Sequence, residues 1–317
     1  DTMTEPRSLF SRRSFLLSAA AGIGGATLLS GCVGTSAPAA SGGDGSASAT
    51  GLVFQNSISD EKPKAALTAV VDGYTALPVT MNTVALEQFR AQLSTYLTSP
   101  NPPDVISWYA GSVATGYAEQ GLLLDVSDLW SGDGACADFS PALKSLSTDA
   151  SGKQIFVPTN YYWWSVFYKK SAFEKWGVQV PTTWDEFLAL CETLQGKGVV
   201  PLTNGIGTSA WMASGWFDIL DLRINGATYH RELLAGEHKF TDPEVVAVMT
   251  EYAKLLPYFT PEQTSWDQQQ AALPLAQDKA AMYLIGAFFT TYMPSDQLDD
   301  IDFFSVPTID PSIPSAE

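Results

Sequence analysis

The sequence predicts an α/β fold with two domains, and three observations support this expectation. The chain has 317 residues, a length that suggests two domains with sizeable cores. Its hydrophobic fraction of 45% and aromatic fraction of 12% are those of an ordinary globular protein. From Leu52 onward, strand and helix patterns alternate, which favours a mostly parallel sheet covered by helices.

The alternating elements occupy residues 52–107. Short apolar runs at 52–55, 78–81 and 104–107 predict strands. Between them, apolar residues recur at helical spacing, at Leu67, Val70, Val71 and Tyr74 and then at Leu86, Phe89, Leu93 and Leu97. Ligands of parallel sheets bind beyond the carboxyl ends of the strands, where this chain has Asn56, Ser57 and Trp108.

Two later helices carry clear start signals. Thr183 and Glu186 form a capping box, and Gly196-Lys-Gly198 ends that helix before a predicted strand at 199–203. Another helix begins at Pro243. Its buried stripe is expected to be Val245, Met249, Tyr252 and Leu256.

Charge, histidines and cysteines exclude several classes of partner. The net charge of −17 argues against nucleic acid and against an anionic membrane surface. His230 and His238 lack the spacing of metal ligands, so neither a metal nor another cofactor is expected. Cys191 lies on the apolar face of its helix and is expected in the core. A disulfide between Cys136 and Cys191 is the alternative.

The first 31 residues have the features of an export signal. Ser11-Arg-Arg-Ser-Phe-Leu-Leu17 resembles a twin-arginine signal peptide, and an apolar run to Leu29 follows it. Leu29-Ser-Gly-Cys32 resembles a bacterial lipobox, which implies cleavage before Cys32 and a lipid on its thiol. An unprocessed membrane anchor is the alternative. Residues 32–50 are rich in Ser, Gly and Ala and are expected to form a disordered tether.

Residues 152–191 carry the strongest functional signal. A predicted strand ending in Val157-Pro158 is followed by the aromatic run Tyr161–Trp164. Side chains of a strand alternate between faces, so these rings cannot all enter one core. We expect two of the four to face a groove, because an exposed aromatic cluster usually marks a recognition surface.

This block resembles the extracellular solute-binding proteins, family 1, of bacterial ATP-binding-cassette importers, in the branch that captures sugars. The resemblance covers most of residues 51–311 and rests on five segments in the family's order, namely 102–108, 116–123, 158–187, 240–246 and 278–286. It implies a two-lobed fold of the type II periplasmic-binding-protein kind. Each lobe would hold a helix-covered, mostly parallel sheet, with a ligand groove between the lobes.

The resemblance also implies domain limits. Lobe one would comprise residues 51–158 plus 280–317, and lobe two residues 159–279. The crossings near Val157-Pro158 and Asp278–Met282 would form the hinge. Family members continue for longer, so a C-terminal remainder is expected to be missing.

A sugar site needs flat aromatic rings for the C–H faces of the sugar and polar side chains for its hydroxyls. The strand ends and the resemblance together give twelve candidates: Asn56, Ser57, Trp108, Tyr161, Tyr162, Trp163, Asn204, Trp211, Trp216, Asp218, Trp266 and Phe288. For each tryptophan the alternative is core packing, and for each Asn and Asp it is a role in a turn. Lys169 and Phe288 depart from the family pattern, which has Asn and Trp there.

The resulting hypothesis is a receptor without enzymatic activity. It would be exported and anchored by lipid to the outer face of the cell membrane. It would deliver a carbohydrate, expected to be an oligosaccharide, to an ATP-binding-cassette permease. A secreted glycosidase is an alternative from another class, but it needs a pair of positioned carboxylates, and no such motif lies among the aromatic residues. The same fold binding a peptide, a polyamine or a metal chelate is the third possibility.

Overall fold

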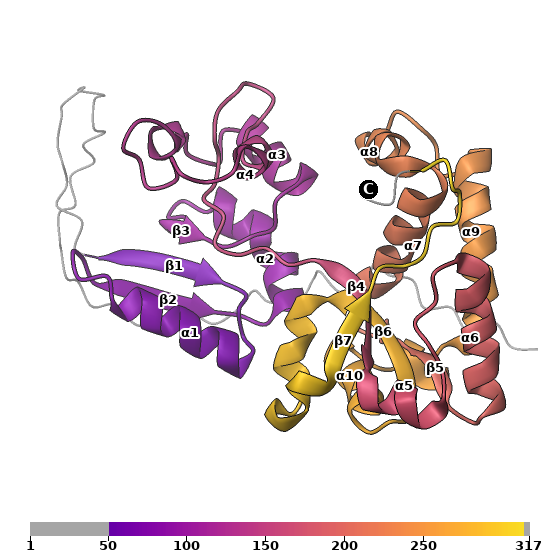
Figure 1. Ribbon diagram of the computed structural model, residues 1–317. Helices are drawn as coiled ribbons and strands as arrows, with labels where there is room; N and C mark the ends of the chain where they lie inside the picture. Colours follow the sequence, from indigo (N-terminus) through magenta and orange to yellow (C-terminus); the bar gives the residue numbers. More distant parts are fainter. Residues whose placement is uncertain (1–50, 314–317) are drawn as a thin grey trace, which may run out of the picture. The chain divides into compact units, whose positions relative to one another are not determined.

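The computed structural model describes residues 51–313 (Figure 1). The predicted signal peptide at 1–31, the lipidation site Cys32 and the predicted tether at 32–50 lie outside the described residues. Within 51–313 the chain forms two β-sheets, each with its own helices. We call residues 51–156 the first lobe and residues 164–313 the second lobe, and residues 157–163 join them.

The sheet of the first lobe is parallel, as predicted. Its strands are β1 (Leu52–Asn56), β2 (Val79–Thr83) and β3 (Val105–Ile106), in the order β2-β1-β3. Helices α1 (Glu61–Asp72) and α2 (Leu86–Thr98) connect the strands. On α2, Phe89, Leu93 and Leu97 are buried together, which confirms the predicted apolar face of this helix. Helix α1 has no buried residue.

Shorter elements complete the first lobe. They are α3 (Ser112–Glu119), the 3-10 helix η1 (Ser127–Trp130) and α4 (Pro141–Leu146). Trp130 is buried, and its ring lies at 87° to the ring of Phe139. Cys136, which lies between these two residues in the sequence, is also buried. Cys136 and Cys191 are both free thiols, so the alternative of a disulfide between them is wrong.

The second lobe is built on a mixed four-stranded sheet. Its strands are β4 (Trp164–Lys169), β5 (Val200–Thr203), β6 (Ala280–Gly286) and β7 (Ile301–Phe304), in the order β5-β6-β4-β7. Strands β5 and β6 are parallel, while β4 is antiparallel to both β6 and β7. The α/β class is therefore confirmed, but only the first sheet is parallel throughout.

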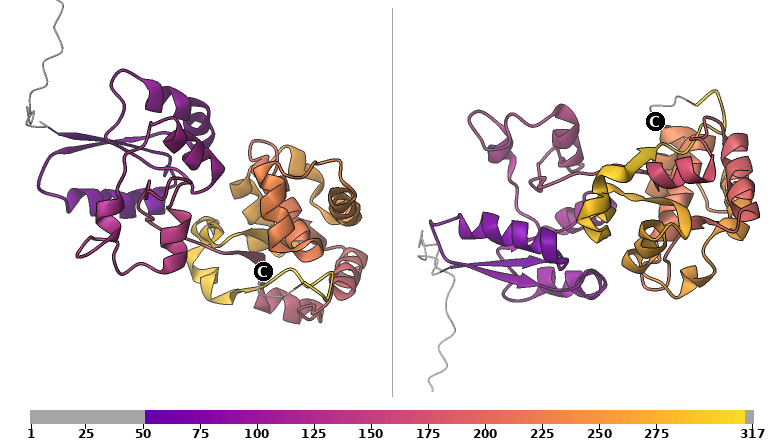
Figure 2. Two further views of the ribbon diagram at one scale, coloured as in Figure 1. Left: turned by 90° about the horizontal axis from the view of Figure 1, so that it is seen from above. Right: turned by 60° about the horizontal axis from the view of Figure 1, so that its bottom comes forward.

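The strand pairing corrects the predicted domain limits. Residues 280–304 were expected to return to lobe one, but β6 lies between β5 and β4 in the second sheet and β7 lies beside β4. Figure 2 shows the orange and yellow segments together around that sheet. A strand whose seven residues are all buried needs neighbours on both edges, and β4 and β5 supply them. The expected crossing near Asp278–Met282 is therefore absent from residues 51–313.

The second sheet has a hydrophobic core on each face. Met282 and Leu284 of β6 face the first core, whereas Tyr283 and Ile285 face the second, as the period of a strand requires. The surrounding helices are α5 (Lys170–Trp176), α6 (Trp184–Gly196), α7 (Trp211–Ile224), α8 (Gly226–Ala235), α9 (Pro243–Leu255) and α10 (Gln268–Ala276). Short 3-10 helices lie at η2 (Leu256–Tyr258), η3 (Pro261–Thr264), η4 (Ala287–Tyr292) and η5 (Ser295–Asp300).

The buried face of α9 differs from the predicted stripe. The helix begins at Pro243 as expected, and Val245 is buried. Met249 is 51% exposed and Leu256 is 57% exposed, whereas Val248 and Leu255 are buried. The buried residues are spaced three and seven apart, and the partly buried Tyr252 lies on the same face, so the observed stripe is rotated about the helix axis from the predicted one.

A capping box begins α6, as predicted. The Thr183 hydroxyl accepts a hydrogen bond from the Glu186 amide at 3.2 Å, and the Glu186 carboxylate accepts one from the Thr183 amide at 3.1 Å. We expect Thr183→Ala to lower the free energy of unfolding by about 1 kcal/mol, measured by urea denaturation. Thr193→Ala on the same helix is the control, since its hydroxyl only donates to the carbonyl of Ala189. Equal losses in the two variants would contradict the capping role.

An ion pair closes the turn between α10 and β6. Lys169 Nζ, at the end of β4, lies 2.7 Å from Asp278 Oδ1 and 3.4 Å from the carbonyl oxygen of Ala276. The Lys169 side chain is only 9% exposed. Asp278 has a φ of 54°, in the left-handed region that residues with a Cβ seldom adopt. Lys169, which stands where the family pattern has Asn, therefore stabilises the strained turn at Asp278.

Candidate functional site

Three segments of the second lobe meet at one edge of its sheet. Strands β5 and β6 are parallel, so both end at this edge, and the antiparallel β4 begins there. Asn204 follows β5, Phe288 follows β6, and the aromatic run 161–163 precedes β4. The amide of Ala287 donates to the carbonyl oxygen of Trp163 at 3.0 Å, which ties two of these segments together. The sheet topology therefore gathers candidates that are far apart in the sequence.

Aromatic rings form a continuous cluster at this edge. Tyr162 meets Phe288 edge-to-face with ring centroids 5.0 Å apart, and Phe288 lies 6.2 Å from Trp211. Trp211 meets Trp164 edge-to-face at 5.9 Å. Gly286 allows this packing, because a Cβ there would lie 2.5 Å from the Phe288 ring and 2.8 Å from the Tyr162 ring.

The aromatic run differs in exposure along its length. Tyr161 is 81% exposed, Trp163 is 51% exposed and Tyr162 is 36% exposed, whereas Trp164 is half-buried. Burial, with a smaller contribution from Tyr109, raises the pKa of Tyr162 to about 12. The Tyr162 hydroxyl is therefore neutral at physiological pH and can both donate and accept a hydrogen bond.

The first lobe presents its candidates at the carboxyl ends of β1 and β3. The Trp108 ring stacks on Phe89 at 5.9 Å and meets Tyr109 edge-to-face at 5.4 Å, and the guanidinium of Arg90 lies 6.0 Å from its centroid. Asn56 is fully buried and serves the local turn. Its amide nitrogen donates to the Asn82 carbonyl, and its oxygen accepts from the Ile58 amide. Ser57 is half-buried.

Trp216 is a core residue, which corrects its place among the candidates. Its side chain is fully buried, between the rings of Phe187 and Phe259. Asp218, two residues further along α7, is 43% exposed and lies 3.9 Å from His230 Nε2. Burial raises the pKa of Asp218, while His230 opposes that shift. We leave Trp216 out of the candidate site.

The remaining candidates are Asn204 after β5, Trp211 at the start of α7 and Trp266 shortly before α10. Asn204 is 1% exposed, and its amide nitrogen donates to Gln263 Oε1 at 3.4 Å. Asn204 Oδ1 and Trp211 Nε1 are two of eight buried side-chain atoms in residues 51–313 that have no hydrogen-bond partner, and the core residue Trp216 supplies another. Trp266 is half-buried, and its carbonyl oxygen accepts a hydrogen bond from the Gly207 amide at 2.8 Å. It precedes α10, whose N-cap is Asp267, rather than opening the helix.

Sequence reasoning missed several polar side chains beside the rings. The Tyr292 hydroxyl donates to Asp60 Oδ2 at 3.1 Å and also bonds the side chain of Gln268. The ring of Tyr292 meets Phe288 edge-to-face at 6.3 Å. Tyr109 could have been inferred, because it directly follows Trp108. Asp60 gave no usable signal, because an Asp before a helix predicts an N-cap.

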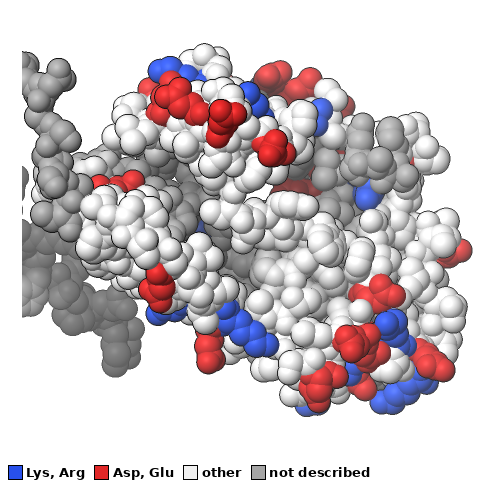
Figure 3. All heavy atoms as spheres, turned by 60° about the vertical axis from the view of Figure 1, so that its left-hand side comes forward, with Lys and Arg blue, Asp and Glu red and all other residues white. Residues whose placement is uncertain are grey.

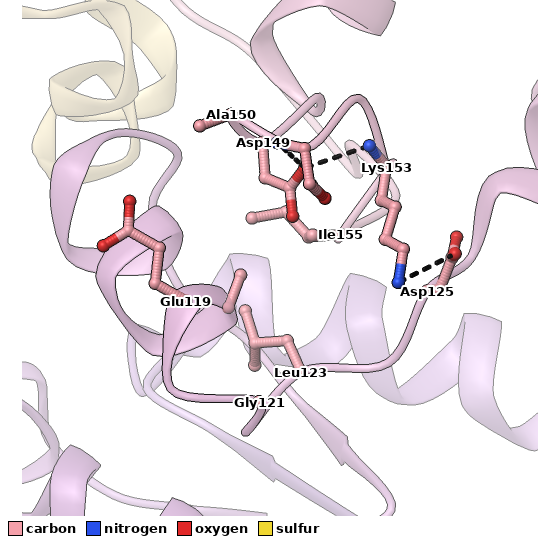
Figure 4. A pocket seen from close by; sticks show the side chains of 10 residues that line it. Glu119, Gly121, Leu123, Asp125, Asp149, Ala150, Lys153 and Ile155 are labelled. Carbon is pink, nitrogen blue, oxygen red and sulfur yellow. Dashed lines mark hydrogen bonds and ion pairs between the residues drawn. The ribbon is translucent and has the colours of Figure 1, made fainter.

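A pocket of about 330 Å³ lies apart from these residues in the first lobe (Figure 4). Glu119, Asp125, Asp149 and Lys153 are among its lining residues, and no candidate is. Hydrogen bonds from Ser127 lower the pKa of Asp125, and bonds from Lys153 and Ser151 lower that of Asp149. Asp125 and Asp149 are thus engaged with their own loops, and the pocket is separate from the candidate site.

Two further properties of residues 51–313 concern membranes and metal ions. The helices of this part of the chain are all too short or too polar to cross a membrane. These residues also include no group of three or more His, Cys, Asp or Glu side chains placed to hold a metal ion.

Two helix-covered sheets with candidates at their strand ends define a fold shared with solved solute receptors. The structure superimposes on the bacterial solute receptor AcbH, described with an exclusive substrate preference for β-D-galactopyranose, with a TM-score of 0.78 and 37% identity. That match covers 83% of this chain and 67% of AcbH. A chitin oligosaccharide binding protein has the same fold, with a TM-score of 0.71 and 22% identity over 81% of this chain and 67% of its own.

The family follows from the sequence. Residues 58–315 match the bacterial extracellular solute-binding protein family, and the chain belongs to it. An uncharacterized ABC transporter extracellular-binding protein of Pyrococcus horikoshii is 24% identical over 68% of this chain and 49% of its own length. The alpha-glucosides-binding periplasmic protein AglE of Rhizobium meliloti is 24% identical over 70% of this chain and 52% of its own. The chain thus spans about half the length of the curated relatives it matches. The predicted family is confirmed, and it is a family of solute receptors rather than enzymes.

Proposed function

We propose that this chain captures a neutral carbohydrate and delivers it to an ATP-binding-cassette permease. The observation that carries the proposal is the aromatic cluster of Tyr162, Phe288 and Trp211, at the edge where β5 and β6 end. Flat rings bind the C–H faces of sugars, and the neutral hydroxyl of Tyr162 suits their polar rims. Trp108 and Tyr109 of the first lobe supply a second set of rings.

The surface charge agrees with an uncharged ligand. On the face drawn in Figure 3, acidic and basic side chains gather toward the edges, and the central band carries few of either. A peptide, a polyamine or a metal chelate would call for a set of charged partners placed to match its own charges. A neutral sugar needs groups that bond hydroxyls, and a single carboxylate can be one of them.

The identity of the sugar is the finer part of the proposal. AcbH is described with a preference for β-D-galactopyranose and AglE as binding alpha-glucosides. D-galactose is therefore the first sugar to test, followed by oligosaccharides. We further propose that the lobes close on the ligand and that a lipid on Cys32 tethers the receptor to the membrane.

A thermal-shift screen tests the proposal. A ligand at a hundred times its dissociation constant stabilises the folded state by about 2.7 kcal/mol, so the binding sugar should raise the melting temperature clearly. Trp108→Ala should keep the fold and weaken sugar binding by about 1–3 kcal/mol, since Trp108 is half-buried at the surface of its core. Stabilisation by peptides or polyamines, with none by sugars, would favour the third possibility instead.

A further inference from the structure

Asp60 occupies an N-cap position without acting as an N-cap. It directly precedes α1, where an Asp side chain ordinarily accepts a hydrogen bond from an amide of the first turn. Here the carboxylate makes no capping bond. Instead, Asp60 Oδ2 accepts a hydrogen bond from the Tyr292 hydroxyl, with the two oxygen atoms 3.1 Å apart. The carboxylate is thus turned away from its own helix and toward the aromatic residues of η4.

Tyr292 is held in place by a directional chain of hydrogen bonds. The Ser209 hydroxyl bonds the amide oxygen of Gln268, and the Gln268 side chain bonds the Tyr292 hydroxyl. Tyr283 fixes the same residue from the other side, donating to the Gln268 carbonyl oxygen at 2.9 Å. Burial raises the pKa of Tyr292, so its hydroxyl keeps the proton that it donates to Asp60.

The surroundings of Asp60 are those of the proposed sugar site. Asp60 Oδ2 lies 3.1 Å from the Tyr292 hydroxyl, and the charge of Asp60 also raises the pKa of Tyr292 and Tyr109. Tyr292 packs against Phe288, and Tyr109 packs against Trp108, so these two tyrosines belong to the aromatic clusters of the two lobes. Arg90 lies over the Trp108 ring, and Glu87, 3.7 Å from Arg90, also raises the pKa of Tyr109.

We propose that Tyr292 is a positioning residue that aims the Asp60 carboxylate at the sugar, and that this carboxylate selects neutral ligands over anionic ones. The inference rests on the proposed function and deepens it. A carboxylate has about four acceptor sites, of which Tyr292 uses one, so Asp60 can accept from two neighbouring sugar hydroxyls. The same charge repels a uronic acid, which carries a carboxylate of its own.

The test compares one neutral sugar with its uronic acid by isothermal titration calorimetry on the full chain. The neutral probe is the sugar that most stabilises the wild type, with D-galactose and D-galacturonate tried first. We expect Asp60→Asn to weaken binding of the neutral sugar about tenfold or more, as for loss of bonds to a charged acceptor. The preference for the neutral sugar over the acid should shrink at the same time.

Tyr292→Phe should weaken neutral-sugar binding by a smaller factor, about three- to tenfold, because Asp60 loses its orientation. For the same reason, the ratio of affinities for the neutral sugar and its uronic acid should decrease. Glu61→Gln is the matched control, since it removes the neighbouring acid of the same helix start and should change neither quantity. The melting temperatures of the ligand-free variants should fall only slightly, because Asp60 caps nothing and the lost contact is the hydrogen bond between Asp60 and Tyr292.

The possible outcomes separate the two proposals. If the wild type binds a neutral sugar and Asp60→Asn keeps both its affinity and its preference, the inference is wrong and the proposed function stands. If Asp60→Asn loses affinity but Tyr292→Phe behaves like the wild type, Tyr292 has no positioning role. If no sugar binds the wild type, the proposed function itself fails and the inference fails with it.

Discussion

Trp216→Ala is expected to lower the free energy of unfolding by about 3–5 kcal/mol. Trp216 is fully buried, and it packs against Phe187 and Phe259 in the core between the second sheet and its helices. Truncation leaves a large cavity that these rings cannot fill. Urea denaturation with a fluorescence or circular dichroism readout measures the loss.

Trp211→Ala is the matched comparison, because Trp211 lies on the same helix but at the edge of the aromatic cluster. It should cost no more than about 1–2 kcal/mol of stability while weakening sugar binding by about 1–3 kcal/mol. If Trp216→Ala proves as stable as Trp211→Ala, the assignment of Trp216 to the core is wrong.

Asp278→Ala is expected to destabilise the second lobe by about 2–3 kcal/mol, since it leaves the Lys169 ammonium nearly buried without its carboxylate. This loss of stability is smaller than expected for a fully buried ion pair, because Asp278 is 28% exposed. Alanine also tolerates the φ of 54° poorly. Asp278→Asn separates the two effects, because Asn adopts the left-handed region more readily and so reports the loss of charge alone. Chemical denaturation is the measurement for both variants.

Lys175→Ala provides the control for this ion pair. Lys175 also contacts Asp278, at 3.6 Å, but its side chain is 64% exposed. Exposed ion pairs contribute about 0–1 kcal/mol, so this variant should unfold almost like the wild type. A loss as large as that of Asp278→Ala would show that exposure does not govern the strength of this pair.

Local signals made the parallel first sheet and the capped helices predictable from the sequence. The strand and helix patterns of residues 52–107 are contiguous, and the Thr183 capping box involves residues three positions apart. The placement of β6 was not predictable in this way. Its pairing joins Trp164 to Gly286, and an all-apolar run does not say which sheet it enters.

The candidate site was predictable where it followed from topology. Trp108, Asn204 and Phe288 lie within two residues after a strand, and strand ends of parallel pairs meet at one edge. Trp211 and Trp216 could not be told apart, because α7 buries residues around most of its circumference. Asp60 and Tyr292 could not be paired at all, since their hydrogen bond joins distant parts of the chain.

The central position of β6 has a consequence for the order in which the protein assembles. The first sheet uses only neighbouring segments, so it can form as soon as residue 106 has been synthesised. The second sheet cannot close until residues 280–286 arrive, because β4 and β5 have no direct pairing and each needs β6 beside it. Until then the apolar edges of β4 and β5 stay open to other chains. Nascent chains that stall before residue 280 should therefore be the species that aggregates, and the interval between the two closures should depend on the rate of translation.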